Sequence, residues 1–174
     1  CEYCIAGANV TKNEYSFFGK DNLKLYITKF AEELIDNDKT KMGIGFTGGE
    51  PLLYWKEIES IIEKIFEEFS SKLDIKIYIN TNASLITNDI ASAFCKYNVK
   101  PYTSLDGISD WNNKVRVYKG GKNTFDDILK GINILRNHNV SCNSFYLTLT
   151  KGNFNFNVKE LMEFAKNNEF NSIT

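Results

Sequence analysis

The sequence predicts an α/β fold in which a parallel sheet is wrapped by outer helices. Strand-like and helix-like segments alternate along the 174 residues, and the links between them are short. This alternation is typical of parallel strands joined by right-handed crossovers. In such folds the chemistry gathers at the carboxyl ends of the strands. Four polar clusters follow successive strand candidates, and we expect them to line one site: TGGEP, NTNAS, SLDG and TLTKG.

The first half of the chain is predicted to hold two helices and two strands. A helix begins after Asp21, a good N-cap, and its apolar residues recur at helical spacing to about Asn37. A strand at 43–46 then leads through a glycine corner to a helix at about 55–69, whose isoleucines form one apolar stripe. The segment LDIKIYIN alternates with period two and predicts a strand that ends at Asn80.

The second half continues the alternation. Helices are predicted in SLITNDIASAFCKYN, TFDDILKGINILRNHN and NVKELMEFAKNN, and strands in VKPYTSLDG, VSCNSFYLTLT and the final FNSIT. Residues 109–123 are predicted to form a long connection over the strand ends. Because a helix precedes the first visible strand, we expect a strand before residue 1. The chain, 1–174, is therefore predicted to be one partial barrel domain that ends near strand six.

Composition excludes several kinds of partner. With 21 basic and 22 acidic residues, the chain has no net field to recruit nucleic acid or an anionic membrane. No apolar run is long enough to span a membrane, and no signal peptide is visible at the start. The 4 cysteines are too few and too unevenly spaced for a disulfide scaffold. We therefore predict a reducing compartment, the cytoplasm.

The stretch GIGFTGGEPLL predicts a sharp corner at the end of a strand. Gly48 and Gly49 allow unusual backbone angles and close approach of a ligand, and Pro51 fixes φ. A carboxylate at such a corner, Glu50, is well placed to meet a cationic group. The alternative is a tight turn whose glutamate points only to water. Thr47, which precedes the glycines, is expected to face a substrate.

The opening CEYC indicates a metal or iron–sulfur site. Two thiolates at this spacing, from Cys1 and Cys4, can be aimed at one point by a turn. A zinc site would need two further ligands, and His138, the only histidine, is predicted to be a surface residue at a helix end. Cys95 and Cys142 are predicted to be buried small apolar residues.

The motifs CEYC and GGEP together resemble those of the radical S-adenosylmethionine (radical SAM) enzymes, in which the motif Cys-x3-Cys-x-aromatic-Cys binds a [4Fe-4S] cluster. Cys1 and Cys4 correspond to its second and third cysteines, and Tyr3 to the aromatic residue. The first cysteine belongs four positions before Cys1, outside the sequence. Because this ligand is missing, the resemblance implies that the 174-residue chain alone should bind its cluster poorly, and we expect it to be inactive by itself. TNASLIT, SLDG, Arg116, GGKNTFDDILKGI and TLTK then follow in the order seen in the peptide and sulfatase maturases, the SPASM-type branch.

The resemblance implies S-adenosylmethionine and a [4Fe-4S] cluster as cofactors. The corner would receive the ammonium of the methionine moiety, Ser104 and Arg116 its carboxylate, and Asn82 and Thr148 the ribose or adenine. As alternatives, Ser104 satisfies a turn, Asn82 caps the helix near Thr87, and Thr148 is an ordinary strand residue. The residues implied in cofactor binding are Tyr3, Gly48, Gly49, Glu50, Pro51, Asn82, Ser104, Arg116 and Thr148, with Cys1 and Cys4 as metal ligands.

The resemblance also implies a reaction. An electron from a donor such as flavodoxin or ferredoxin reduces the cluster, cleavage of S-adenosylmethionine gives a 5′-deoxyadenosyl radical, and the radical abstracts hydrogen from a peptide or protein side chain. Trp111 and Asn112 stand where the branch has His-Asp, whereas Asp106 of SLDG matches, with an Asx-turn as the alternative. A non-catalytic peptide-binding module with a structural cysteine pair is the rival function. A phosphate-using enzyme is disfavoured because TGGEP lacks the lysine of a phosphate loop.

Overall fold

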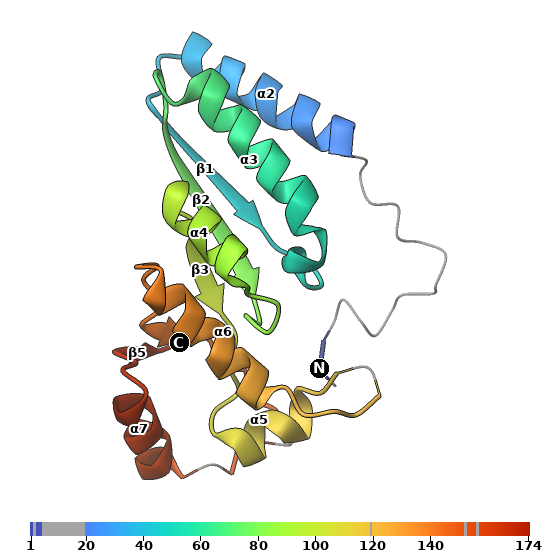
Figure 1. Ribbon diagram of the computed structural model, residues 1–174, viewed down its shortest axis with the longest axis vertical. Helices are drawn as coiled ribbons and strands as arrows, with labels where there is room; N and C mark the ends of the chain where they lie inside the picture. The colour runs from blue at the N-terminus through green and yellow to red at the C-terminus, as the bar shows by residue number, and fades with distance from the viewer. Residues whose placement is uncertain (2, 5–19, 119, 152, 156) are drawn as a thin grey trace.

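The computed structural model describes residues 1, 3–4, 20–118, 120–151, 153–155 and 157–174 (Figure 1). Helices and parallel strands alternate along this part of the chain, as the sequence predicts. The helical elements are α2 (Lys20–Asp36), the 3-10 turn η1 (Pro51–Tyr54), α3 (Trp55–Phe69), α4 (Asn88–Lys96), α5 (Ser109–Val115), α6 (Phe125–Asn137) and α7 (Val158–Asn167). The strands are β1 (Lys41–Phe46), β2 (Asp74–Thr81), β3 (Lys100–Thr103), β4 (Ser144–Phe145) and β5 (Ser172–Ile173).

The strands form one parallel series in chain order. β1, β2 and β3 make a three-stranded parallel sheet, and β4 and β5 pair in parallel beside it. A parallel bridge between Ser104 and Tyr146 joins the two ladders. At this junction Tyr146 N donates to Thr103 O at 2.8 Å, and Leu105 N donates to Tyr146 O at 3.0 Å. All five carboxyl strand ends therefore face the same edge.

The two faces of the sheet differ in chemistry. Along β2, Ile75, Ile77 and Ile79 are buried, whereas Lys76 is exposed and Tyr78 is only partly covered. Figure 1 shows α3, α4 and α6 in sequence over one side of the strands. The predicted apolar stripe of α3 is confirmed, because its isoleucines are almost fully buried in this core. The most deeply buried residues of the whole core include Ile61, Ile62, Ile65, Ile77, Ile79, Phe94, Ile128, Ile132, Leu135 and Phe145.

Residues 109–123 differ from the prediction of a long connection. α5 occupies the first half of this segment, and an antiparallel bridge joins Val117 to Asn123. Asn112 of α5 is fully buried, accepts a hydrogen bond from Asp106 N at 3.2 Å and donates to Thr124 Oγ1 at 3.1 Å. The helix was missed because a buried asparagine, rather than an apolar stripe, holds it in place.

Other predictions are corrected in detail. The strand predicted in VSCNSFYLTLT is limited to β4, and Cys142 lies before it, buried as expected. Cys95 is exposed on α4 instead of buried. His138 is half-buried at the end of α6 and lies within hydrogen-bond distance of Asn88 Oδ1, at 3.1 Å, and Ser92 Oγ, at 3.2 Å, of α4.

In the described part of the chain, no helix is both long enough and apolar enough to cross a membrane.

Gly131 allows α6 to lie directly against the loop that follows β2. A Cβ at this position would overlap the carbonyl oxygen of Ala83, which is itself buried at a positive φ of 60°. Both clashing groups are constrained, since one is helix backbone and the other is a loop carbonyl. The loop residues 82–86 belong to the candidate site, so this contact connects core packing to site geometry.

We expect Gly131→Ala to destabilise the fold by about 2–3 kcal/mol, because α6 must move away from Ala83 to relieve the overlap. Chemical denaturation of purified protein would measure the change. Gly45→Ala is the matched control, since nothing lies within 4 Å of a Cβ there. Equal stability of both variants would contradict the close approach of α6.

Candidate active site

Glu50 cross-links the ends of β1 and β2. Its Oε1 accepts hydrogen bonds from Leu52 N at 3.2 Å and from Thr81 Oγ1 at 2.7 Å, and its Oε2 accepts from Asn82 N at 2.9 Å. The alternative of a glutamate pointing only to water is therefore wrong. A carboxylate offers about four acceptor positions, so Oε2 keeps capacity for one more donor.

The glycines beside this carboxylate leave the backbone open. Gly48 has a φ of 135°, a conformation that other residues rarely adopt, and Gly49 follows it directly. Nothing lies within 4 Å of a Cβ built on either residue, and both are exposed. Pro51 then begins η1 and is buried. The corner thus presents backbone groups and one half-buried carboxylate to the strand-end edge, as the sequence predicts.

Asn82 belongs to the same corner rather than to the helix that follows. Its Oδ1 accepts from Ser84 N at 2.9 Å, while its backbone N donates to Glu50. The alternative in which Asn82 caps α4 is wrong, because Thr87 Oγ1 is the acceptor for Ile90 N at 3.3 Å. Asn82 instead lines a small pocket, of about 80 Å³, that Cys1 and Arg116 also line.

Asp106 is the centre of a second group of contacts. It has no exposed surface. Its Oδ1 accepts from Thr148 N at 2.9 Å, and its Oδ2 accepts from the Tyr3 hydroxyl at 2.6 Å and lies 2.8 Å from Arg116 Nε. None of these partners is a backbone group two residues on, as an Asx-turn requires, so the Asx-turn alternative is wrong. The motif SLDG at a strand end was the signal for this residue, although sequence reasoning did not place it among the site residues.

The Arg116 side chain contacts both Asp106 and Cys1. Its Nη2 donates to the Tyr3 hydroxyl at 2.6 Å, and its Nη1 donates to Cys1 Sγ at 3.3 Å. The short contact between Nε and Asp106 is an ion pair whose angle does not meet that of a hydrogen bond, because Nε is the one buried side-chain polar atom of the described residues without a hydrogen-bond partner. Arg116 is only 9% exposed, and its guanidinium is engaged at all three nitrogens.

Tyr3 is held as a neutral phenol between these charges. Burial, followed by its hydrogen bond to Asp106, raises its pKa from 10.0 to about 12, although Arg116 and Thr148 oppose this shift. The phenol therefore remains protonated at neutral pH and donates to the buried carboxylate. This hydrogen bond holds Tyr3, and with it the turn of Cys1 and Cys4, near the ends of β3 and β4.

Cys1 and Cys4 lie on one turn, closed by a hydrogen bond from Cys4 N to Cys1 O at 3.2 Å. Both are free thiols, with Cys1 exposed and Cys4 half-buried. Two accessible sulfurs on one turn, one of them next to a cation, fit an iron–sulfur cluster. Within the described residues no group of three or more His, Cys, Asp or Glu side chains is placed to hold a metal ion.

Ser104 directly follows β3, and Thr148 lies further along the chain than the end of β4. Ser104 N donates to Thr81 O at 2.9 Å, which extends the pairing of β2 with β3. Thr148 lies beyond β4 and is exposed, and its backbone N is used by Asp106. The predicted residues therefore converge in two groups, one around Glu50 and one around Asp106, which the pocket beside Asn82 connects.

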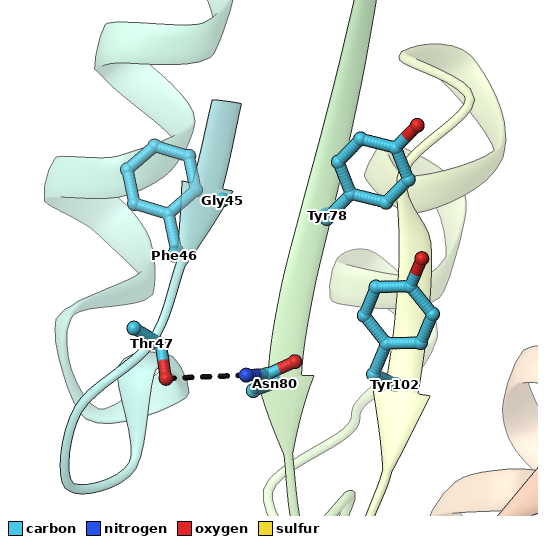
Figure 2. Close-up of a pocket in the computed structure, with 6 residues that line it drawn as sticks. All are labelled: Gly45, Phe46, Thr47, Tyr78, Asn80 and Tyr102. Carbon is cyan, nitrogen blue, oxygen red and sulfur yellow. Dashed lines mark hydrogen bonds between the residues drawn. The ribbon is translucent and has the colours of Figure 1, made fainter. Parts of the chain in front are cut away.

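A separate hollow lies on the open face of the sheet (Figure 2). It has a volume of about 320 Å³ and no charged residue in its lining. Asn80 Nδ2 donates to Thr47 Oγ1 at 3.2 Å on its floor, and the Tyr78 and Tyr102 rings stack at 5.7 Å along one side. Gly45 of β1 has no side chain, so it leaves this side of the hollow open. Thr47, expected to face a substrate, lies at the boundary between this hollow and the glycine corner.

The sequence matches the radical SAM superfamily over residues 1–165. The chain therefore belongs to this superfamily, as the cysteine and glycine motifs predict. It is 28% identical over 176 residues to the radical SAM cyclopropyl synthase TigE of Paramaledivibacter caminithermalis, covering 96% of this chain and 36% of the relative. It is also 31% identical over 152 residues to the serine-type anaerobic sulfatase-maturating enzyme of Bacteroides thetaiotaomicron, covering 83% of this chain and 35% of the relative.

Solved structures confirm the fold class. The structure described as native anSMEcpe with bound AdoMet and Kp18Cys peptide superposes with a TM-score of 0.84 at 20% identity, over 99% of this chain and 46% of that chain. Native anSMEcpe with bound AdoMet gives a TM-score of 0.81 at 19% identity, with the same coverage of 99% and 46%. The chain thus has the fold of part of these proteins, the predicted partial barrel of the radical SAM type, and it spans less than half of their length.

We expect Glu50→Gln to lower stability by about 1–2 kcal/mol, because an amide retains one acceptor oxygen and must lose at least one of the three contacts. Denaturant unfolding would measure this. Glu67→Gln, at an exposed position on α3, is the matched control and should be neutral. A neutral Glu50→Gln would mean that the carboxylate does not hold the two strand ends together.

Proposed function

We propose that the protein containing this chain is a radical SAM enzyme that removes a hydrogen atom from a peptide or protein side chain. The observation that carries the proposal is the turn of Cys1 and Cys4, held by Tyr3 at the strand ends beside a glycine corner. When bound, the [4Fe-4S] cluster and S-adenosylmethionine supply the chemistry, by one-electron cleavage of the carbon–sulfur bond of the cofactor. The residues of this chain hold and orient these groups.

Cys1 and Cys4 are proposed to ligate the cluster through their thiolates. Tyr3 positions the turn between them through its hydrogen bond to Asp106. Residues 1–174 are accordingly proposed to be part of the radical SAM core domain.

The glycine corner is proposed to bind the ammonium of the methionine moiety. Exposed backbone at Gly48 and Gly49 and the remaining acceptor position of Glu50 Oε2 provide oxygens for a cation. Pro51 holds this corner in place by starting η1. Because Thr81 and Asn82 already orient the carboxylate, it is fixed before the ligand arrives.

The carboxylate of the same moiety is proposed to lie near Ser104 and Arg116. A guanidinium carries five N–H groups, and three nitrogens with one partner each leave N–H groups for a ligand. Asn82 and the exposed side chain of Thr148 are proposed to contact the ribose or adenine. Both lie next to a carboxylate hub, Asn82 at Glu50 and Thr148 at Asp106.

A peptide or protein substrate is supported by the names of the relatives. They include a cyclopropyl synthase and sulfatase-maturating enzymes, and one solved structure of the same fold carries a peptide. The uncharged hollow of Figure 2, which begins where the corner ends, is large enough for a peptide side chain. A flavodoxin or ferredoxin is proposed as the reductant. The free cysteines are consistent with the cytoplasm as the site of action.

The test is anaerobic reconstitution of the full-length protein, with iron and sulfide analysis and electron paramagnetic resonance before and after addition of S-adenosylmethionine. We expect about four irons at this site and a reduced signal that changes when the cofactor is added. Zinc in place of iron, or no metal, would refute the enzyme and favour a peptide-binding module with a structural cysteine pair.

Variants assign the ligands. Cys1→Ala and Cys4→Ala should each abolish the signal of this cluster, because each removes one sulfur ligand. Cys95→Ala is the matched control, since Cys95 is exposed on α4, away from the strand ends, and should leave the iron content unchanged. Full retention of the signal in Cys4→Ala would contradict the proposed ligand set.

A further inference from the structure

We propose that Arg116 tunes the cluster by donating a hydrogen bond to the ligating sulfur of Cys1, and that Asp106 and Tyr3 are positioning residues that hold the guanidinium there. The contact itself is Nη1 to Sγ at 3.3 Å. The inference rests on the proposed function, since it concerns a cluster bound by Cys1. It assigns to Arg116 a role in the electron transfer that precedes any contact with substrate.

The guanidinium has little freedom to move away from the sulfur. Asp106 lies 2.8 Å from Nε, and the Tyr3 hydroxyl accepts from Nη2 at 2.6 Å. The backbone is also anchored, because Arg116 N donates to Asn112 O at 2.7 Å and Arg116 O accepts from Thr124 Oγ1 at 2.8 Å. Both the backbone of Arg116 and its guanidinium group are therefore held in place, with Nη1 directed at Cys1.

The ion pair that holds the guanidinium is poorly screened by water. Arg116 is 9% exposed and Asp106 is 0% exposed, and the contact of Arg116 with the exposed Cys1 is part-buried. An N–H donor and a positive charge near a ligating thiolate stabilise the reduced cluster, which carries one more negative charge than the oxidised cluster. The reduction potential is therefore expected to be higher with Arg116 in place than without it.

Asp106 holds the guanidinium in place, and its negative charge offsets the positive charge of Arg116. The ion pair is neutral as a unit, so the effect on the sulfur comes from the direction of the N–H group and the nearness of Nη1 rather than from net charge. Two sets of variants can separate these contributions. Arg116→Lys keeps the charge without the planar fork of donors. The double variant Arg116→Met and Asp106→Asn removes both charges, so the site remains neutral and no buried charge is left unpaired.

The experiment is a redox titration of the reconstituted full-length protein, followed by electron paramagnetic resonance, without S-adenosylmethionine. Leaving the cofactor out removes any contribution from a contact between Arg116 and its carboxylate. We expect a midpoint potential more negative than that of the wild type in the double variant, and a smaller negative shift in Arg116→Lys. Iron content is measured first in every sample. Arg136→Met is the matched control, because Arg136 donates to Cys142 O and Glu169 O, outside the site, and its midpoint should not change.

Unchanged or more positive midpoints in both variants, at wild-type iron content, would overturn the inference and leave the proposed function intact. Absence of a cluster from the wild type would instead refute the proposed function. If the double variant loses its cluster, Arg116→Lys decides the matter: a negative shift at full iron content supports the inference, and an unchanged midpoint overturns it.

Discussion

Asp106 has no exposed surface, so its carboxylate must find all of its partners inside the protein. Those partners come from three distant segments: Tyr3 between the cysteines, Arg116 after α5, and Thr148 beyond β4. Satisfying one buried charge therefore fixes the cysteine turn against the strand ends. Asn112 completes the arrangement by accepting from the backbone of Asp106, and this contact makes α5 part of the site rather than a covering loop.

Glu50 applies the same principle with a different result. Its carboxylate also joins separate elements, through Thr81 and Asn82, but it remains half-buried and stands beside exposed glycine backbone. One carboxylate is thus enclosed and organises the chain, while the other is open and keeps an acceptor position for a ligand. The two groups lie along the same edge of the sheet, Glu50 after β1 and Asp106 after β3, and the pocket lined by Cys1 and Asn82 lies between them.

One face of the sheet packs in the hydrophobic core, and the other face carries the hollow proposed to receive a substrate. Its helix-facing side is filled with isoleucine, and close approach of α6 at Gly131 brings the loop after β2 into position. Its other side is open above Gly45 and carries the stacked rings of Tyr78 and Tyr102. Because side chains alternate along a strand, the same strands that build the core also present the hollow of Figure 2 next to the glycine corner.

By itself the sequence determined the alternation of helices and parallel strands, the corner at Gly48 and Gly49, and the cysteine pair, because periodicity, glycine chemistry and ligand spacing are local properties. Only the tertiary structure decided that Asp106 is a buried centre, that α5 holds a buried asparagine, and that Arg116 reaches Cys1. The physical reason is the same in each case. The contacts of Tyr3 with Asp106 and of Arg116 with Cys1 join residues that are far apart in the chain, and the burial of Asp106 and Asn112 becomes visible only when the fold has brought their partners around them.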